Sequence, residues 1–339
     1  MATMNRQIHL VSRPEGEASV ANFKVIDAPV AELHDGQVLV RNHFLSLDPY
    51  MRGRMNDAKS YAKPQELNTV MGGGTVGEVV ESKHPGYQAG DSVVAMGGWQ
   101  QYAVVDGAMP GALRKVDTSR IPLSAYLGAV GMPGVTAWYG LTKICEAKTG
   151  QTIVVSAASG AVGSVVGQLA KARGCRAVGT AGGPDKCRYV VDELGFDACI
   201  DYKAHADTKS LYAALKEATP DGVDGCFENV GGAVFDATLA RMNAFGRIAL
   251  CGMISGYNGA PIPLQQPQLI LQSRLRVEGF IVSEHMDVWP AALTELGTMV
   301  ASGKLKYRET VAQGLDAAPE AFLGLLKGRN FGKQLVKLV

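Results

Sequence analysis

Two glycine-rich stretches have the composition of a turn that binds the phosphates of a dinucleotide. Residues 71–80, MGGGTVGEVV, hold Gly72, Gly74 and Gly77 in the spacing G-x-G-x-x-G. Such a turn needs a strand before it and a helix after it, because the helix supplies unpaired N–H groups and the positive end of its dipole. A poor strand precedes Gly72, and a strand rather than a helix follows Gly77. The context therefore argues against a phosphate site in this stretch.

The stretch AASGAVGSVVG, residues 157–167, is the better candidate for that turn. It follows the apolar strand TIVVS and opens a helix, although its first turn residue is Ala158 rather than glycine. Gly160 allows the backbone to approach a pyrophosphate, and Gly163 and Gly167 allow the helix to pack closely on the strand. The same glycines would also fit a helix packed tightly on a sheet without a ligand. Their clustering at the strand-to-helix turn favours a dinucleotide site.

The choice between NAD and NADP is made at the end of the second strand, where a carboxylate would bind the ribose 2′-hydroxyl of NAD. Here the strand RAVGTA ends in two glycines, 182 and 183, and Lys186 and Arg188 follow. Cations suit a 2′-phosphate, whereas Asp185 follows a proline and is more typical of a helix start. The sequence therefore predicts NADP(H), although Lys186 would also fit a solvated position on a helix.

A tyrosine in a glycine-rich loop is the candidate for acid–base chemistry. The loops ENVGG (228–232) and CGMISGYNG (251–259) follow predicted strands, and their small residues let a flat ring approach the backbone. Tyr257 is neutral at pH 7 and can donate a hydrogen bond. Such a donor would stabilise the enolate that forms when hydride adds to the β-carbon of an unsaturated ketone or aldehyde. A loop aromatic that only packs on a cofactor is an equally good interpretation of this residue alone.

Further candidates lie in the first third of the chain. The loop LDPYMRGRM (47–55) places Tyr50 and Arg52 after a predicted strand. Tyr50 is a second candidate catalytic residue in a substrate cleft, or a tyrosine that closes a turn against the core. Arg52 and Tyr61 are candidates for lining the substrate. None of the six histidines pairs with a cysteine at a ligand-like spacing, and His43 is more typical of a structural residue. The sequence therefore predicts no metal site.

The elements that must position these residues predict an α/β protein with two domains. Short strands in QVLVRNHFLSLD, TVGEVVESK, DSVVAMG and QQYAVVD are typical of a small barrel or sandwich. Helices then alternate with apolar strands, which predicts a doubly wound parallel sheet. The tail, APEAFLGLLKG and NFGKQLVKLV, is expected to return to the first domain. The predicted domains are 1–122 with 304–339 for the barrel and 123–303 for the Rossmann domain.

Composition excludes several classes of function. A chain of 339 residues suggests about two domains, and a net charge of +1 without a basic stripe argues against nucleic acid as a partner. Six separated cysteines without a C-x-x-C pair fit a reducing compartment. We see neither a secretory signal nor an apolar run long enough to span a membrane. The expected protein is soluble and cytoplasmic, with small molecules and copies of itself as partners.

The order of these features resembles the medium-chain dehydrogenase/reductase superfamily. The motifs AASGAVGSVVGQLAK, CFENVGG, LDPYMR, CGMISGYN and NFGKQLV are similar to one branch over nearly the whole chain. That branch contains prostaglandin reductases, leukotriene hydroxydehydrogenases, plant double-bond reductases and bacterial NADPH-dependent curcumin reductases. The resemblance implies a GroES-like N-terminal barrel, a Rossmann domain and NADPH-dependent reduction of C=C bonds conjugated to a carbonyl. It also implies a metal-free site, because zinc-dependent relatives carry Gly-His-Glu where this chain has three glycines at 72–74.

The same resemblance assigns site residues. The family's loop tyrosine, which handles the enolate oxygen, corresponds to Tyr257. The residues expected to bind NADP(H) are Gly160, Ala161, Val162, Gly163, Lys186, Tyr202, Asn229, Cys251, Gly252, Met253, Tyr257, Phe280, Ile281, Val282 and Asn330. A cofactor contact from Asn330 implies that the tail closes over a cleft between the domains. A homodimer paired through the strand VEGFIV is expected on the same grounds.

Three other functions stay open at this point. A close rival is an NADPH-dependent quinone oxidoreductase, and a second is an NADP-binding structural or sensor protein without turnover. A zinc alcohol dehydrogenase is a third, and it would require bound metal. The favoured substrate is a rather apolar enone or enal, because the candidate loops offer few charges beyond Arg52.

Overall fold

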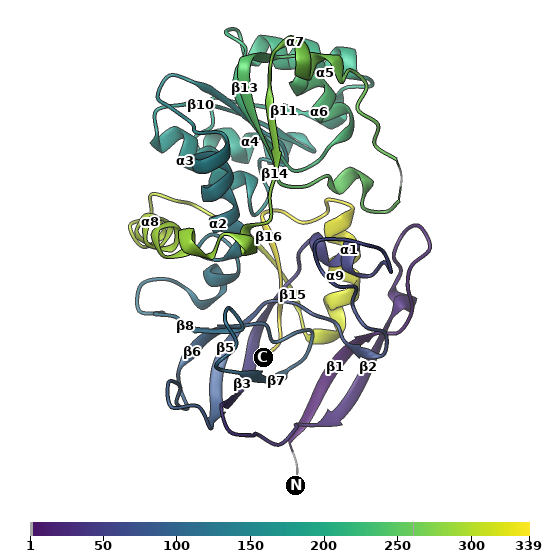
Figure 1. The fold of residues 1–339 in the computed structure, drawn as a ribbon, viewed down its shortest axis with the longest axis vertical. Helices are drawn as coiled ribbons and strands as arrows, with labels where there is room; N and C mark the ends of the chain where they lie inside the picture. Colours follow the sequence, from purple (N-terminus) through teal and green to yellow (C-terminus); the bar gives the residue numbers. More distant parts are fainter. Residues whose placement is uncertain (1–2, 260) are drawn as a thin grey trace. The chain divides into compact units, whose positions relative to one another are not determined.

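The computed structural model describes residues 3–259 and 261–339, which form two compact units (Figure 1). Unit 1 contains the chain up to Leu127 together with Glu309–Val339, and unit 2 is Gly128–Arg308. The borders therefore lie at 127/128 and 308/309, beyond the predicted 122/123 and 303/304.

Unit 1 is built from two sheets. Its strands are β1 (Met4–Leu10), β2 (Phe23–Pro29), β3 (Gln37–Ser46), β4 (Thr69–Val70), β5 (Thr75–Ser82), β6 (Ser92–Ala95), β7 (Tyr102–Asp106), β8 (Leu113–Lys115), β15 (Glu309–Gln313) and β16 (Lys333–Lys337). Its helices include α1 (Tyr50–Arg54) and α9 (Ala318–Leu326). One sheet has the order β2-β1-β4, and the other has the order β15-β16-β3-β5-β6-β8 with β7 paired to β3. All pairs except β15–β16 are antiparallel, as expected for the N-terminal β domain.

Local packing explains why both borders differ from the predicted ones. Leu123–Leu127 forms a 3-10 helix that packs against β3, β5 and β6, and this places it in unit 1. At the second border, the Lys306 backbone exchanges hydrogen bonds with the Gln168 side chain of unit 2, at 2.8 Å in both directions. The guanidinium of Arg308 lies over the ring of Tyr189, also in unit 2. Neither contact is visible from local sequence.

The C-terminal strand completes unit 1, and this confirms the predicted return of the tail. β16 pairs antiparallel with β3 and parallel with β15. The Lys333 ammonium donates hydrogen bonds to the Asp48 carboxylate at 2.6 Å and to the Leu47 carbonyl at 2.8 Å. The two charged side chains are only 4% and 8% exposed, and breaking a buried pair of this kind costs about 3–5 kcal/mol. The return strand is therefore firmly tied to the segment that leads into Tyr50.

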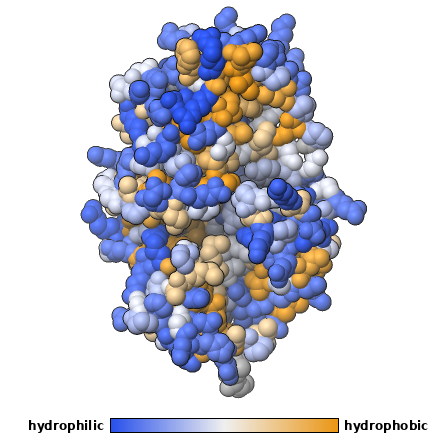
Figure 2. All heavy atoms as spheres, in the orientation of Figure 1, coloured by the Kyte–Doolittle hydropathy of each residue, from blue (hydrophilic) through white to orange (hydrophobic). Residues whose placement is uncertain are grey.

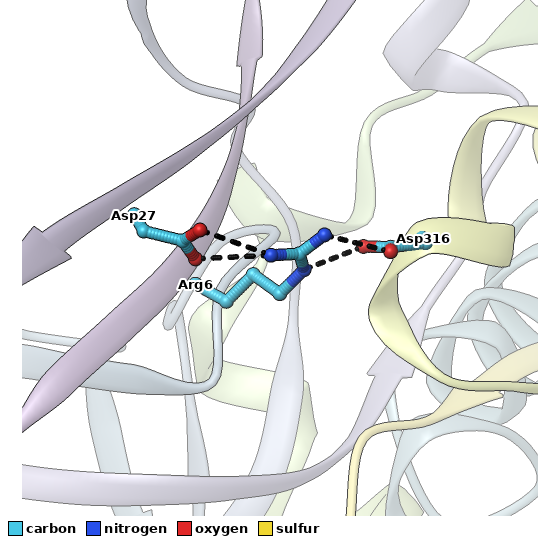
Figure 3. Close-up of polar contacts among 3 residues, drawn as sticks. All are labelled: Arg6, Asp27 and Asp316. Carbon is cyan, nitrogen blue, oxygen red and sulfur yellow. Dashed lines mark hydrogen bonds and ion pairs between the residues drawn. The ribbon is translucent and has the colours of Figure 1, made fainter.

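Arg6 makes a second link between the N-terminal and C-terminal parts of unit 1, in a more exposed position (Figure 3). Its guanidinium contacts Asp27 of β2 at 3.0 Å and Asp316, just before α9, at 2.8 Å. All three side chains are more than a third exposed, so water screens these ion pairs. The contacts orient β1, β2 and the chain before α9 but add little stability compared with the buried pair.

The glycines of residues 71–80 serve packing within unit 1. Gly77 lies inside β5, and the next element is strand β6, so the strand context expected for this stretch is confirmed. A Cβ at Gly77 would lie 2.0 Å from the Arg41 carbonyl oxygen on β3. A Cβ at Gly73 would lie 2.9 Å from the Met51 side chain. Glycine therefore stands at these two positions because a neighbouring strand and a core side chain leave no room for a Cβ.

Unit 2 contains a parallel sheet with helices in its connections. The strands are β9 (Thr152–Val155), β10 (Arg176–Ala181), β11 (Ala198–Asp201), β12 (Val223–Glu228), β13 (Met242–Leu250) and β14 (Arg276–Gly279). Their order is β11-β10-β9-β12-β13-β14, and all neighbours are parallel. The predicted doubly wound sheet is confirmed. The direction of winding reverses between β9 and β12, and ligands bind such sheets at the carboxyl ends beside that reversal.

The α-helices of unit 2 are α2 (Met132–Tyr139), α3 (Gly163–Ala172), α4 (Pro184–Asp192), α5 (Thr208–Ala218), α6 (Gly232–Leu239), α7 (Gln268–Gln272) and α8 (Trp289–Ala301). The helix expected after the glycine-rich turn is α3, and its apolar side chains Val165, Val166 and Leu169 are fully buried. By contrast, the sequence does not predict α2 and α6. Their residues are apolar on nearly every face of the helix, so the alternation of apolar and polar positions about every 3.6 residues is missing. No helix in the described part of the chain is both long and apolar enough to cross a membrane.

Candidate functional site

The turn between β9 and α3 is built around one backbone carbonyl. Ala157 adopts a left-handed conformation with φ of 50°, and its carbonyl accepts a hydrogen bond from the Gly160 N–H at 2.9 Å. A Cβ at Gly163 would lie only 2.4 Å from the same carbonyl oxygen. The helix can therefore begin here only if residue 163 lacks a side chain.

The start of α3 offers N–H groups to a ligand. The backbone N–H groups of Val162 and Gly163 lie at the N-terminal end of α3, where the first N–H groups of a helix have no acceptor within the helix. Val162 precedes the helix, and its side chain makes no capping hydrogen bond. Such N–H groups add to the positive end of the helix dipole. The turn therefore suits a phosphate group, as the binding of a dinucleotide requires.

Gly167 has a different packing role from the predicted one. A Cβ at this position would lie 1.8 Å from the ring of Phe196, a buried residue between α4 and β11. The same ring would lie 3.3 Å from a Cβ at Gly179 on β10. Gly167 thus admits an aromatic ring between helix and sheet rather than bringing the helix directly onto a strand. Phe196 is far from Gly167 in sequence, so the local motif could not reveal this contact.

The loop after β10 brings a tyrosine and a lysine from the chain after β11 next to Gly182. A Cβ at Gly182 would lie 2.8 Å from the Tyr202 hydroxyl oxygen and 2.9 Å from Lys203 Cε. The Asp201 carboxylate holds this arrangement by accepting hydrogen bonds from the N–H groups of Gly183 at 2.7 Å and Lys203 at 3.0 Å. Lys203 has no place in the predicted site, because its sequence position gives no sign that it lies beside the end of β10.

Lys186 and Lys203 make this loop favourable for an anion. The pKa of the Lys186 ammonium is lowered by burial and, to a smaller extent, by the charge of Lys203. A bound anion would offset both effects by favouring the charged ammonium. Asp185, in the first turn of α4, instead forms an exposed ion pair with Arg188. That arrangement agrees with its interpretation as a helix-start residue.

The buried carboxylate of Glu228 holds the loop that follows β12. Its oxygen Oε1 accepts hydrogen bonds from the Val230 and Gly231 N–H groups, each at 2.7 Å, and from the Ser156 hydroxyl at 3.0 Å. Burial raises the pKa of this carboxyl, while the N–H donors lower it. Glu228 is absent from the predicted site. One feature of the sequence could have pointed to it: Glu228 is an acidic residue at the end of the otherwise apolar segment GCFE.

The same residue links the loops after β9, β12 and β13. The Glu228 carbonyl accepts hydrogen bonds from the N–H groups of Cys251 at 2.9 Å and Gly252 at 3.1 Å. Asn229 donates from its backbone N–H to the Ser156 hydroxyl at 2.7 Å and from its side chain to the Ser156 carbonyl at 2.8 Å. Predicted cofactor residues on two loops are therefore fixed to one another and to the end of β9.

Tyr257 folds back over its own loop. Its hydroxyl oxygen faces the Met253 N–H, which donates to it at 3.5 Å. A Cβ at Gly252 would lie 3.1 Å from that oxygen and 3.4 Å from the Asn229 carbonyl oxygen. The absence of a side chain at Gly252 therefore lets the phenol approach the Asn229 loop. In the same loop, burial raises the pKa of the Cys251 thiol to about 12, so this thiol is neutral at physiological pH.

The segment Phe280 to Val282 follows β14. The Phe280 ring packs against Phe227 and Tyr139, with ring centroids 6.2 and 5.4 Å apart. Val282 is buried, and its carbonyl accepts a hydrogen bond from the Trp289 indole at 3.2 Å. These contacts fix the backbone, including Ile281, at the carboxyl end of the last strand.

Tyr50 and Arg52 lie on α1 of unit 1. Tyr50 packs against the core of the unit, and burial raises the pKa of its phenol. Arg52 is 2% exposed and donates hydrogen bonds to the Gly16 carbonyl at 2.6 Å and the Asn56 side chain at 2.7 Å. Such contacts are typical of a structural arginine. The predicted contacts of both residues with substrate stay predictions.

Tyr61 and Asn330 also belong to unit 1. The Tyr61 side chain is 57% exposed, and the Asn330 amide donates a hydrogen bond to the Gly332 carbonyl at 2.7 Å. The predicted substrate contact of Tyr61 and the predicted cofactor contact of Asn330 stay predictions.

Metal ligands are a separate question. No group of three or more His, Cys, Asp or Glu side chains in the described ranges is arranged to hold a metal ion. His43 lies on β3, and burial lowers the pKa of its ring.

Two family profiles and several relatives match this chain. The profile described as N-terminal domain of oxidoreductase matches residues 6–113, and the one described as Zinc-binding dehydrogenase matches residues 161–298. The NADPH-dependent curcumin reductase of Escherichia coli is 45% identical over 341 residues, which cover 98% of this chain and 97% of that protein. The NADP(+)-dependent 2-alkenal reductase of Nicotiana tabacum is 44% identical over 342 residues, with the same coverage of 98% and 97%.

A solved structure shows the same fold. CurA from Vibrio vulnificus in complex with NADPH is 43% identical, with a TM-score of 0.91, and the match covers 98% of this chain and 99% of that chain. The chain therefore belongs to the medium-chain dehydrogenase/reductase superfamily, in the branch that includes these reductases. The predicted family and fold class are confirmed. A metal-free site stays a prediction for this chain.

Replacement of Glu228 tests the link between the loops. Glu228→Ala removes the acceptor of two N–H groups, which costs about 1–3 kcal/mol for each unsatisfied donor. We expect a lower free energy of unfolding and faster hydrogen–deuterium exchange at Val230 and Gly231. Glu228→Gln retains an oxygen acceptor of nearly the same shape and is the matched control, so it should keep most of the protection. Unchanged exchange in Glu228→Ala would contradict the role assigned to this carboxylate.

Proposed function

We propose that this chain is an NADPH-dependent reductase of C=C bonds conjugated to a ketone or aldehyde carbonyl. The observation that carries the proposal is the approach of the Tyr257 phenol to Gly252 and the Asn229 loop. This approach occurs at the carboxyl ends of β12 and β13, where a Rossmann sheet binds its ligand. Relatives named NADPH-dependent curcumin reductase and 2-alkenal reductase support the same class of reaction.

Residues of unit 2 fit NADP(H). The turn from Ala157 to Gly163 offers backbone N–H groups for the pyrophosphate, and Lys186 with Lys203 offers positive charge for the 2′-phosphate. When bound, NADPH supplies the hydride that reaches the β-carbon of the substrate. We propose that the other contacts in this unit come from Tyr202, Asn229, Cys251, Gly252, Met253, Tyr257, Phe280, Ile281 and Val282. Asn330 of unit 1 is proposed as a further contact.

Tyr257 acts on the oxygen end of the substrate. Addition of hydride to the β-carbon leaves negative charge on the carbonyl oxygen, and the neutral phenol stabilises it by donating a hydrogen bond or its proton. The Met253 N–H faces the phenol oxygen, so it supports the charge that this oxygen gains as its proton leaves. Tyr50 is proposed as a second residue in contact with substrate, and Arg52 and Tyr61 as further lining residues.

Substitution of the tyrosine tests the mechanism. Tyr257→Phe removes the hydroxyl and keeps the ring, so we expect kcat for an enone to fall by roughly 10²-fold with little change in NADPH affinity. The measurement is NADPH consumption with an enone and with a quinone on the same preparation. Faster turnover of the quinone, unaffected by Tyr257→Phe, would favour a quinone oxidoreductase over the proposed enzyme. Cofactor binding without turnover of any enone would favour a structural or sensor protein.

Substitution of Lys186 tests the choice of cofactor. Lys186→Ala removes a charge-assisted hydrogen bond worth about 1.5–3 kcal/mol, which corresponds to roughly a 10- to 100-fold rise in the Kd of NADPH. The Kd of NADH, which lacks the 2′-phosphate, should change little. Fluorescence titration measures both. Lys209→Ala, on the exposed surface of α5, is the control and should leave both values unchanged. An equal loss of affinity for the two cofactors would argue against a 2′-phosphate contact.

A cytoplasmic homodimer is proposed as the assembled form. β14 is the last strand of its sheet, so its outer edge can pair with the same strand of a second copy. Figure 2 shows apolar residues gathered over the part of unit 2 that carries α7, where Leu271 is 79% exposed. Light scattering of the purified chain measures the mass in solution. A monomer at micromolar concentration would contradict this assembly.

A further inference from the structure

Two cysteine thiols meet behind the loop that contains Lys186. Cys187 lies on α4 and Cys199 lies on β11, and Cys199 Sγ donates a hydrogen bond to Cys187 Sγ at 3.2 Å. Both residues are half-buried, so a small reagent in solution can reach them. We refer to these two residues as the thiol pair. Neither has a role in the proposed hydride transfer.

The two thiols differ in reactivity. The pKa of the Cys187 thiol is lowered, chiefly because it accepts the hydrogen bond from Cys199, whereas the pKa of Cys199 is raised by donating it. The thiolate is the nucleophilic form of cysteine. By contrast, burial raises the pKa of Cys145 to about 12 and raises that of Cys226 well above its usual value. Cys187 is therefore the better nucleophile, and Cys199 is placed to react with it next.

The thiol pair lies at the base of the proposed 2′-phosphate site. Cys187 directly follows Lys186, and its Sγ lies 4.0 Å from the carbonyl oxygen at the end of β10. Cys199 is two residues before Asp201, whose carboxylate holds the loop through Gly183. A change in the distance between α4 and β11 at this point would therefore displace Lys186 and disturb the hydrogen bonds of Asp201 at the same time.

We propose that the thiol pair is a modification site for peroxides, where a disulfide forms and weakens the binding of NADPH. This inference rests on the proposed function, because it takes the Lys186 loop as the 2′-phosphate site. The Cys187 thiolate attacks hydrogen peroxide to give a sulfenic acid and hydroxide, which takes up the proton released by Cys187. The Cys199 thiol then attacks the sulfenic sulfur, forming the disulfide and releasing water. In total, two thiols are oxidised, and one peroxide is reduced to two waters.

The disulfide changes cofactor affinity through geometry. A disulfide holds its sulfurs much closer than the 3.2 Å between these thiols, and the inference is that the first turn of α4 moves toward β11 as the bond forms. Lys186 moves with that turn. A displaced charge-assisted hydrogen bond corresponds to about a tenfold rise in the Kd of NADPH. By thermodynamic linkage, bound NADPH must disfavour the disulfide by the same factor.

The experiment uses the full-length protein and hydrogen peroxide. NADPH and NADH are first titrated against the reduced protein, and the titrations are repeated after peroxide treatment and again after reduction with dithiothreitol. Mass spectrometry of peptides identifies the disulfide. We expect a Cys187–Cys199 link, about a tenfold rise in the Kd of NADPH, little change for NADH, and full reversal. Cys199→Ser should abolish the effect, whereas Cys175→Ser, which removes a buried cysteine outside the pair, should retain it.

Each outcome separates this inference from the function on which it rests. Absence of the link, or a link that leaves the Kd of NADPH unchanged, would overturn the inference while reduction of enones by the reduced protein stands. A peroxide effect that persists in Cys199→Ser would also overturn it. If the reduced protein bound no NADPH, the proposed function would fail and the affinity change would fail with it, even where the link forms.

Discussion

The hydrogen bonds to Glu228 are the interaction on which the candidate site depends. One buried residue accepts from the Val230 and Gly231 N–H groups, from the Ser156 hydroxyl and, through its carbonyl, from the loop after β13. A buried donor that loses its acceptor costs more than a typical hydrogen bond contributes. The ends of β9, β12 and β13 are therefore coupled. Contacts within the chain hold their loops, and such preorganised donors are what stabilisation of developing charge requires.

Close approach around glycine is the second constraint, and it acts at three strand ends. A Cβ at Gly163 would meet the Ala157 carbonyl, one at Gly182 would meet the Tyr202 hydroxyl, and one at Gly252 would meet the Tyr257 hydroxyl. In each case the atom that occupies the space is polar and belongs to the candidate site. Glycine at these positions therefore brings functional atoms together as well as allowing the backbone to turn.

Local patterns predicted the parts of the fold that are themselves local. The alternation of apolar strands and helices indicated the parallel sheet, and the clustered glycines after TIVVS indicated the turn at Ala157. Such patterns could not predict contacts between residues that are distant in sequence. The ring of Phe196 against Gly167 and the hydrogen bond from Arg52 to the Gly16 carbonyl depend on how separated segments pack. The role of Glu228 also depends on the Ser156 hydroxyl, which follows another strand, β9.

The two ends of the proposed cofactor site rely on different physical interactions. At the proposed 2′-phosphate end, Lys186 and Lys203 would act by charge in a partly exposed loop, where salt would screen their effect. At the proposed nicotinamide end, Glu228, Asn229 and Tyr257 are held by short-range hydrogen bonds and packing, which salt affects little. Selection of the cofactor and the reaction on the substrate are therefore separable. On the proposed function, a change at the exposed loop would alter which cofactor binds and how tightly, while the groups proposed to stabilise the enolate would stay in place.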